Sequence, residues 1–201
     1  MEATFQASKR TLCVFCGSSP GARPEYMRAA RDFGRLLVAR GYDLVYGGSS
    51  VGVMTAVADA VLECGGRVTG VIPEAFVRKE IAHSGLTELR VVGSMHERKA
   101  LMADLSDGFV GLPGGLGTLE EFFEVVTWAQ LGIHEKPCGL LNACGYFDDL
   151  SRFLDHIVDE AFLKPEHRAT ILVEDDAERL LDRLEGVVPP RVEKWIRPDQ
   201  A

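Results

Sequence analysis

Residues 108–132 read GFVGLPGGLGTLEEFFEVVTWAQLG. The apolar run at 108–112 predicts a buried strand, and the apolar residues that recur at helical spacing from Leu119 predict a helix over 119–132. Between them, residues 113–118 (PGGLGT) form a glycine-rich loop that runs into a helix start near Thr118. A buried strand, a loop and a helix in this order are the building unit of parallel α/β sheets.

The same succession of strand and helix recurs on both sides of this stretch. Further strands are predicted at 12–15, 43–46, 67–72, 89–92, 138–141 and 170–173, and further helices at 24–40, 52–63, 95–106, 146–160 and 176–185. Strands that are apolar throughout, joined by helices, indicate a parallel sheet covered on both faces. We therefore expect a doubly wound, Rossmann-like α/β fold in one domain over 1–201. Its core would span about 11–185, and the segment 186–201, with Pro189-Pro190, would form a tail.

Composition and charge limit the function classes. The chain has 201 residues, of which 46% are hydrophobic and 26% charged, as in ordinary globular proteins. The formal net charge of -8 disfavours nonspecific nucleic-acid binding, although a small anionic ligand is compatible with it. No apolar run is long enough to cross a bilayer, so no membrane partner is expected.

The cysteines predict a reducing compartment. Their number, five, is odd, and residues 1–10 lack the apolar core of a signal peptide, so we expect a cytoplasmic protein. Cys13 and Cys16 form a CxxC motif, which could be a redox or zinc pair. In a strand, however, residues three apart point to opposite faces, which favours two small buried side chains.

Three glycine-containing loops follow predicted strands. They are 17–19 (GSS), 47–52 (GGSSVG) and 113–118. Each could be a plain tight turn. Because the carboxyl ends of parallel strands meet at one edge of the sheet, where ligands bind in such folds, their coincidence favours a ligand site.

The loop at 113–118 predicts a phosphate site. Glycines let backbone N–H groups face a ligand, and a helix N-terminus adds unsatisfied donors and a positive dipole. No lysine follows as in a P-loop, and Glu120 stands where a dinucleotide fingerprint has its third glycine. A mononucleotide phosphate is the simpler interpretation.

Acidic residues open the helix after this loop. Glu121 forms a capping box with Thr118, so Glu120, Glu121 and Glu124 could serve only the helix N-terminus. Beside a phosphate loop, a carboxylate could instead stabilise an oxocarbenium ion or activate water. Both interpretations stay open on residue types alone.

Two cations occupy the start of another helix. A capping box at Ser94–Glu97 begins it, and Arg98 and Lys99 follow in its first turns, where the helix dipole disfavours positive charge. They indicate either a neighbouring anion or a solvated surface pair. The five histidines show no metal-ligand spacing, so no metal is expected.

The segments SMHERKALM (94–102), PGGLGTLEE (113–121) and VVTWAQLGIHEKP (125–137) together resemble the Lonely Guy family. The loops at 17–19 and 46–54 resemble the family's as well, and the resemblance runs from about residue 11 to 185. It implies a Rossmann-like homodimer that hydrolyses N6-modified adenosine 5′-monophosphates to the free base and ribose 5-phosphate, without a cofactor. Plain AMP would also be a substrate. The main departures are the two chain ends and His83-Ser84-Gly85.

The resemblance also implies residue roles. Arg98 and Glu121 would be the catalytic pair, with Lys99 beside them. The remaining nucleotide contacts, with the phosphate loop first, would be Gly114, Gly115, Leu116, Gly117, Thr118, Glu80, Glu120, Thr127, Ser18, Gly48 and Met95.

Two other functions are compatible with parts of the sequence. Relatives have been labelled lysine decarboxylases, but that reaction needs pyridoxal phosphate on a Schiff-base lysine, and only Lys99 offers any such setting. A nucleotide carrier or sensor would use the same fold without turnover. The helix from residue 119 carries apolar residues around most of its circumference, which predicts a homodimer built on it, or else a fully internal helix.

Overall fold

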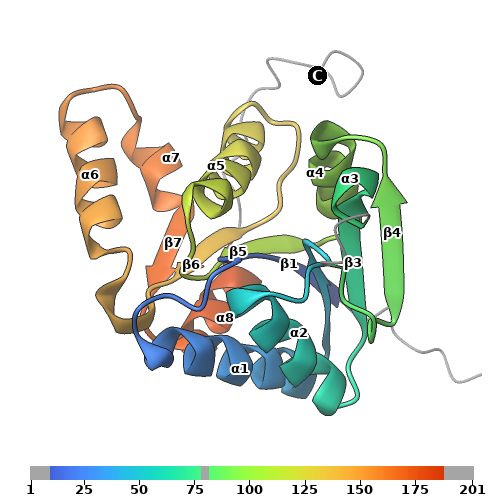
Figure 1. Cartoon of the computed structure of the whole chain (residues 1–201). Helices are drawn as coiled ribbons and strands as arrows, with labels where there is room; N and C mark the ends of the chain where they lie inside the picture. Colours follow the sequence, from blue (N-terminus) through green and yellow to red (C-terminus); the bar gives the residue numbers. More distant parts are fainter. Residues whose placement is uncertain (1–9, 78–81, 188–201) are drawn as a thin grey trace, which may run out of the picture.

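A wholly parallel sheet runs through the middle of the molecule (Figure 1). The computed structural model describes residues 10–77 and 82–187, and within them the sheet has seven strands. These are β1 (Arg10–Phe15), β2 (Tyr42–Tyr46), β3 (Val68–Pro73), β4 (Glu88–Val92), β5 (Gly108–Gly111), β6 (Cys138–Leu141) and β7 (Ile171–Glu174). Their order is β4-β3-β2-β1-β5-β6-β7, with every neighbouring pair parallel. The predicted fold class is confirmed.

Helices cover both faces of the sheet (Figure 1). The helices, including the short 3-10 helix η1, are α1 (Pro24–Ala39), α2 (Gly52–Glu63), α3 (Glu74–Val77), α4 (Met95–Asp104), α5 (Leu116–Gln130), η1 (Ala143–Gly145), α6 (Asp148–Asp159), α7 (Pro165–Ala169) and α8 (Ala177–Gly186). Helices α1, α2 and α8 pack on one face, and α4, α5 and α6 pack on the other. In the described chain, no helix is both long and apolar enough to span a membrane.

Strand β1 shows how the two layers share one element. Its side chains alternate, with Val14 in the core on the α1 side and Cys13 and Phe15 in the core on the α5 side. Cys16 lies on the α1 side, so the CxxC cysteines are buried on opposite faces, as predicted. Burial raises the pKa of both thiols. They are therefore packing residues rather than a redox or zinc pair.

The strand order reverses between β1 and β5, and the loops that follow these two strands meet there. The Gly17 N–H donates to the Pro113 carbonyl at 3.1 Å, and the Met54 N–H, at the start of α2, donates to the Gly17 carbonyl at 3.3 Å. A doubly wound sheet opens its ligand crevice at such a reversal. The predicted glycine loops thus lie side by side.

Several element boundaries differ from the predicted ones. Helix α5 begins at Leu116 rather than at 119, because the first N–H groups of a helix need no partner within it and Gly117 costs little there. The helix expected from 146 begins at Asp148, and the short helices α3 and α7 were not predicted. The tail expected at 186–201 lies outside the described residues beyond Val187.

Candidate active site

A cavity of about 490 Å³ lies beyond the carboxyl ends of the central strands. The loops after β1, β2, β3 and β5 surround it, together with the first turns of α4 and α5. Its polar side chains are those of Ser18, Ser49, Arg98, Thr118 and Glu121. Its apolar side chains are those of Val14, Cys16, Val51, Met54, Ile72, Pro73, Phe76 and Leu116. A largely apolar cavity with a few converging polar groups is the usual form of a small-molecule site.

The cavity contains an ion pair between α4 and α5. Arg98 Nη1 lies 2.9 Å from Glu121 Oε1, and the side chains are only 12% and 11% exposed. Arg98 Nε also donates to the Val71 carbonyl at 3.1 Å. The Arg98 guanidinium and the end of the Met54 side chain occupy the space that a Cβ at Gly47 would need, so a larger residue there would displace them. The structure therefore brings the two predicted catalytic residues together in a fixed arrangement.

Burial and charge act in opposite directions on Glu121. Burial raises its pKa, the Arg98 guanidinium lowers it, and the net result lies above the ordinary value for glutamate. A carboxylate in this setting can stabilise a nearby positive charge that water would otherwise screen.

The capping interpretation of Glu121 is wrong. The N-cap of α5 is Gly115, without any side-chain cap bond, and Thr118 is the third helical residue rather than the cap. Glu121 thus lies beyond the first turn and caps nothing. At the start of α4, half of the predicted capping box is present, because Ser94 Oγ accepts from the Glu97 N–H at 3.1 Å. The reciprocal bond is shifted by one residue: Glu97 Oε2 accepts from the Gly93 N–H rather than from that of Ser94.

The phosphate loop forms the rim of the cavity next to this ion pair. Thr118 is buried, and its side chain fills the space that a Cβ on Gly114 would need. Gly115 and Gly117 face open space, and Leu116 is 85% exposed. The first N–H groups of α5 therefore border the cavity without side chains in front of them, which suits a phosphate.

Lys99, Glu120 and Thr127, which the sequence placed at the nucleotide, lie outside the cavity lining. Lys99 is buried, and its Nζ lies 2.6 Å from Glu120 Oε1 and 3.0 Å from Glu124 Oε1, so it joins α4 to α5. The Thr127 hydroxyl, about three turns into α5, donates to the Phe123 carbonyl at 2.7 Å.

The other predicted contacts are dispersed around the cavity. Ser18 lines it, whereas Met95 is exposed at the start of α4 with its sulfur 3.9 Å from Arg98 Nη1. Gly48 is in the left-handed region, with a φ of 76°, and its carbonyl accepts from the His83 N–H at 2.9 Å. Glu80 lies outside the described residues.

Sequence reasoning missed Tyr146 as a neighbour of this site. Its hydroxyl donates to the Gly114 carbonyl at 2.5 Å, from a segment 32 residues further along the chain. A lone tyrosine at the start of a predicted helix carries no motif, so no sequence signal identified it.

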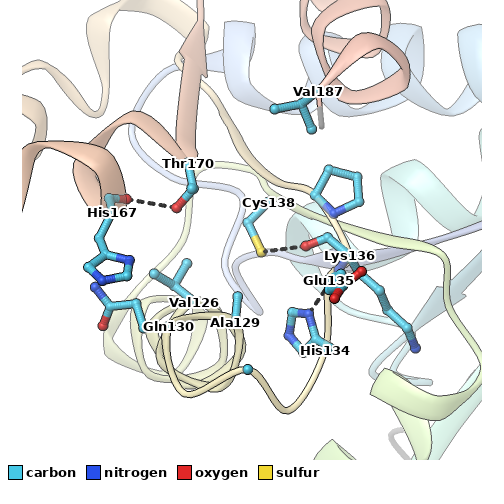
Figure 2. A pocket seen from close by; sticks show the side chains of 12 residues that line it. Val126, Ala129, Gln130, His134, Glu135, Lys136, Cys138, His167, Thr170 and Val187 are labelled. Atoms are coloured by element: carbon cyan, nitrogen blue, oxygen red, sulfur yellow. Dashed lines mark hydrogen bonds between the residues drawn. The ribbon is translucent and has the colours of Figure 1, made fainter. Parts of the chain in front are cut away.

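A further hollow lies near the amino ends of strands β6 and β7, at the end of the sheet opposite the cavity (Figure 2). It lies beside the end of α5 and the starts of β6 and β7, and its lining includes Gln130, His134, Cys138, His167 and Val187. None of the predicted site residues belongs to this lining. Across the described part of the chain, no group of three metal-ligating side chains comes together.

Comparisons with known proteins identify relatives of this chain. A family model described as "possible lysine decarboxylase" matches residues 54–184. A rice protein described as probable cytokinin riboside 5′-monophosphate phosphoribohydrolase LOGL9 is 54% identical over 92% of this chain and 81% of its own. Cytokinin riboside 5′-monophosphate phosphoribohydrolase LOG3 of Arabidopsis thaliana is 49% identical over 92% of this chain and 87% of its own.

Solved structures share the fold. The molybdenum cofactor carrier protein of Chlamydomonas reinhardtii superposes with a TM-score of 0.66 at 20% identity, over 88% of this chain and 96% of its own. At that identity the likeness establishes the Rossmann-like architecture alone.

Proposed function

Because the chain belongs to the LOG (Lonely Guy) family, we propose that it is a cytokinin riboside 5′-monophosphate phosphoribohydrolase. It hydrolyses the N-glycosidic bond of N6-modified adenosine 5′-monophosphates, and of AMP itself, to the free base and ribose 5-phosphate. The observation that carries this proposal is the buried Arg98–Glu121 pair in a cavity beside a glycine-rich helix start.

Different residues act on the phosphate, the ribose and the base of the nucleotide. The N–H groups at the start of α5 hold the 5′-phosphate, which fixes the ribose in the cavity. As the bond between C1′ and the purine nitrogen breaks, positive charge develops on the ribose ring and negative charge on the base. The Glu121 carboxylate stabilises the former, and water supplies hydroxide to C1′ and a proton to the base. Arg98 orients both Glu121 and the nucleotide through its fork of donors.

Lys99 argues against amino-acid decarboxylation. Burial alone would lower its pKa, but hydrogen bonds from Lys99 to Glu120 and Glu124 outweigh burial and raise it. A Schiff-base lysine must be neutral to attack a carbonyl, so a lysine held charged between two carboxylates is poorly placed for that role. The name of the family model therefore does not describe chemistry that this lysine supports.

The setting of the reaction follows from charge, chemistry and resemblance. We propose that the enzyme acts in the cytoplasm on a small nucleotide, as a homodimer and without nucleic acid. The net charge of -8 supports the last point, because it repels a polyanion while the helix start still attracts one phosphate locally.

One chromatographic experiment separates a hydrolase from a carrier or sensor. The protein is incubated with AMP, N6-isopentenyl-AMP and adenosine, and the products are resolved. We expect free base and ribose 5-phosphate from both nucleotides and far slower release from adenosine, because the phosphate supplies binding energy that positions the ribose. A carrier would return every nucleotide intact. Comparable rates with adenosine and AMP would contradict the phosphate site.

A further inference from the structure

We propose that Tyr146 is a positioning residue that orients the peptide between Gly114 and Gly115 in the phosphate loop. The proposal deepens the proposed function and rests on it. Its basis is the hydrogen bond of 2.5 Å from the Tyr146 hydroxyl to the Gly114 carbonyl.

The peptide that Tyr146 contacts is packed against Gly17 and Thr118 at Gly114, whereas its Gly115 side is open. Both residues are glycines, so no Cβ restricts the dihedral angles on either side of the bond. Gly115 is exposed, and no atom lies within 4 Å of the point where its Cβ would be. A helix start built on such a peptide needs an external contact to keep one orientation.

Because the peptide is planar, the hydrogen bond to the Gly114 carbonyl also sets the direction of the Gly115 N–H. In a trans peptide the C=O and the following N–H point in opposite directions. When the Gly114 carbonyl turns toward Tyr146, the Gly115 N–H must turn away from it. Gly115 is the N-cap of α5 and lines the cavity, so its N–H is one of the donors available to a phosphate. The tyrosine hydroxyl therefore selects the peptide orientation that defines this donor.

The Tyr146 ring is itself held firmly. It meets Tyr26 edge-on, with centroids 5.5 Å apart and planes at 77°, and meets Phe147 at 4.9 Å and 84°. Phe147 is buried, and its N–H donates to Asn142 Oδ1 at 2.6 Å. Tyr146 is 41% exposed, but two aromatic contacts and an anchored backbone restrict the position of its hydroxyl. The Gly114 carbonyl is thus held by a rigid support.

The outer side of the phosphate loop offers little other packing. A hollow of about 400 Å³ borders it there, shares Ser18 and Gly115 with the catalytic cavity, and is walled by Tyr26 and Tyr146. On the inner side, the Gly17 N–H already holds the Pro113 carbonyl. Tyr146 therefore completes the support of the loop from the direction in which it would otherwise be free to move.

The test is Tyr146→Phe, which keeps both ring contacts and removes only the hydroxyl. The loss of one hydrogen bond predicts a rise of roughly three- to tenfold in KM for AMP and in Kd for ribose 5-phosphate. We expect kcat for AMP to stay within about twofold and the slow rate with adenosine to stay unchanged, because the effect passes through the phosphate alone. Thermal melting verifies that the variant is folded.

The matched control is Tyr42→Phe, which removes a hydroxyl bonded to Glu185 at 3.0 Å, at the start of β2 and away from the cavity. It should leave every constant for AMP and ribose 5-phosphate unchanged. A second variant, Tyr146→Leu, should show at least the phosphate-specific loss of Tyr146→Phe.

Three results would overturn the proposal. They are an unchanged KM and Kd in Tyr146→Phe, an equal loss with adenosine and AMP, and a loss confined to Tyr146→Leu, which would assign the effect to ring packing. If the native protein released no base from AMP, the proposed function would fail separately. Calorimetric binding of ribose 5-phosphate would still decide the role of Tyr146.

Discussion

At the scale of single residues, Glu121 combines burial with an ion pair to Arg98. We predict that Glu121→Gln keeps the fold and the binding of AMP, because the shape is retained and the residue caps no helix. Turnover should fall by roughly a hundredfold or more, equivalent to about 3 kcal/mol of barrier, because the negative charge near C1′ is lost. Adenine release, AMP binding and thermal melting on the variant measure the three effects.

The control for this variant is Glu178→Gln, which neutralises an exposed glutamate in the first turn of α8. It should show native turnover. A Glu121→Gln enzyme that turns over normally would end the catalytic assignment, whatever its stability.

His134, which lines the hollow of Figure 2, makes the stability of the protein depend on pH. Its Nε2 faces the Val125 carbonyl at 2.9 Å and its Nδ1 accepts from the Lys136 N–H at 3.1 Å, so the bonded form is neutral. Burial lowers its pKa to about 4, below the ordinary 6.5. The unfolded chain thus binds the proton first, and stability that is fully present above pH 6.5 is lost as the pH falls toward 4.

Urea unfolding at pH 7.5 and at pH 5 tests this assignment. We expect His134→Gln to lose less stability than the native protein between the two pH values, because the titrating group is gone. His156→Gln, on the exposed face of α6, should keep the native pH dependence. Equal pH dependence in the native protein and in His134→Gln would show that His134 is protonated alike in both states.

At the scale of elements, the placement of α4 against α5 determines the site, because each helix supplies one member of the Arg98–Glu121 pair. Lys99 crosses the same boundary to Glu120 and Glu124. Glu124 Oε2 is buried and has no hydrogen-bond partner among the described residues, so Lys99 is what compensates that carboxylate. The bridge therefore holds the two helices in register.

We predict that Lys99→Met destabilises the protein by about 2 kcal/mol, because it leaves the partly buried carboxylate of Glu124 unpaired. The double variant Lys99→Met/Glu124→Gln should recover part of that loss in chemical unfolding, since the uncompensated charge is removed. A direct contact of Lys99 with nucleotide would give a different result, namely weak AMP binding in both variants with no loss of stability.

The sequence predicted elements best where apolar periodicity was strong. The strand and helix succession, and the convergence of the loops at 17–19 and 113–118, followed from the apolar runs and the glycines between them. The predicted start of α5 at residue 119 was wrong, because glycines usually indicate a loop. The first turn of a helix nevertheless tolerates them, and α5 begins at Leu116. Tyr146 was missed because its contact with Gly114 arises from the packing of distant segments, which no local pattern encodes.

At the scale of the whole molecule, the reversal of strand order between β1 and β5 explains why so few residues make a site. It places the loop after β1 against the loop after β5, and α2 begins at the same point. Arg98 and Glu121 reach this point from the start of one helix and the second turn of another. At such a reversal, a few side chains and the backbone donors of the loops suffice to surround a mononucleotide.

The apolar surface of α5 that remains exposed predicts how the protein assembles. In the folded chain, Phe122, Val125 and Val126 are buried. Phe123 and Leu131 are only half-buried, and Thr127 is exposed, so part of the apolar surface of this helix still contacts solvent. We expect a homodimer that covers this stripe. Light scattering at micromolar concentration should give twice the chain mass, and Thr127→Arg should halve it by placing charge in the interface. Ala39→Arg, exposed at the end of α1 in the opposite helical layer, should remain dimeric. A native monomer would contradict the dimer, and a dimeric Thr127→Arg protein would place the interface elsewhere.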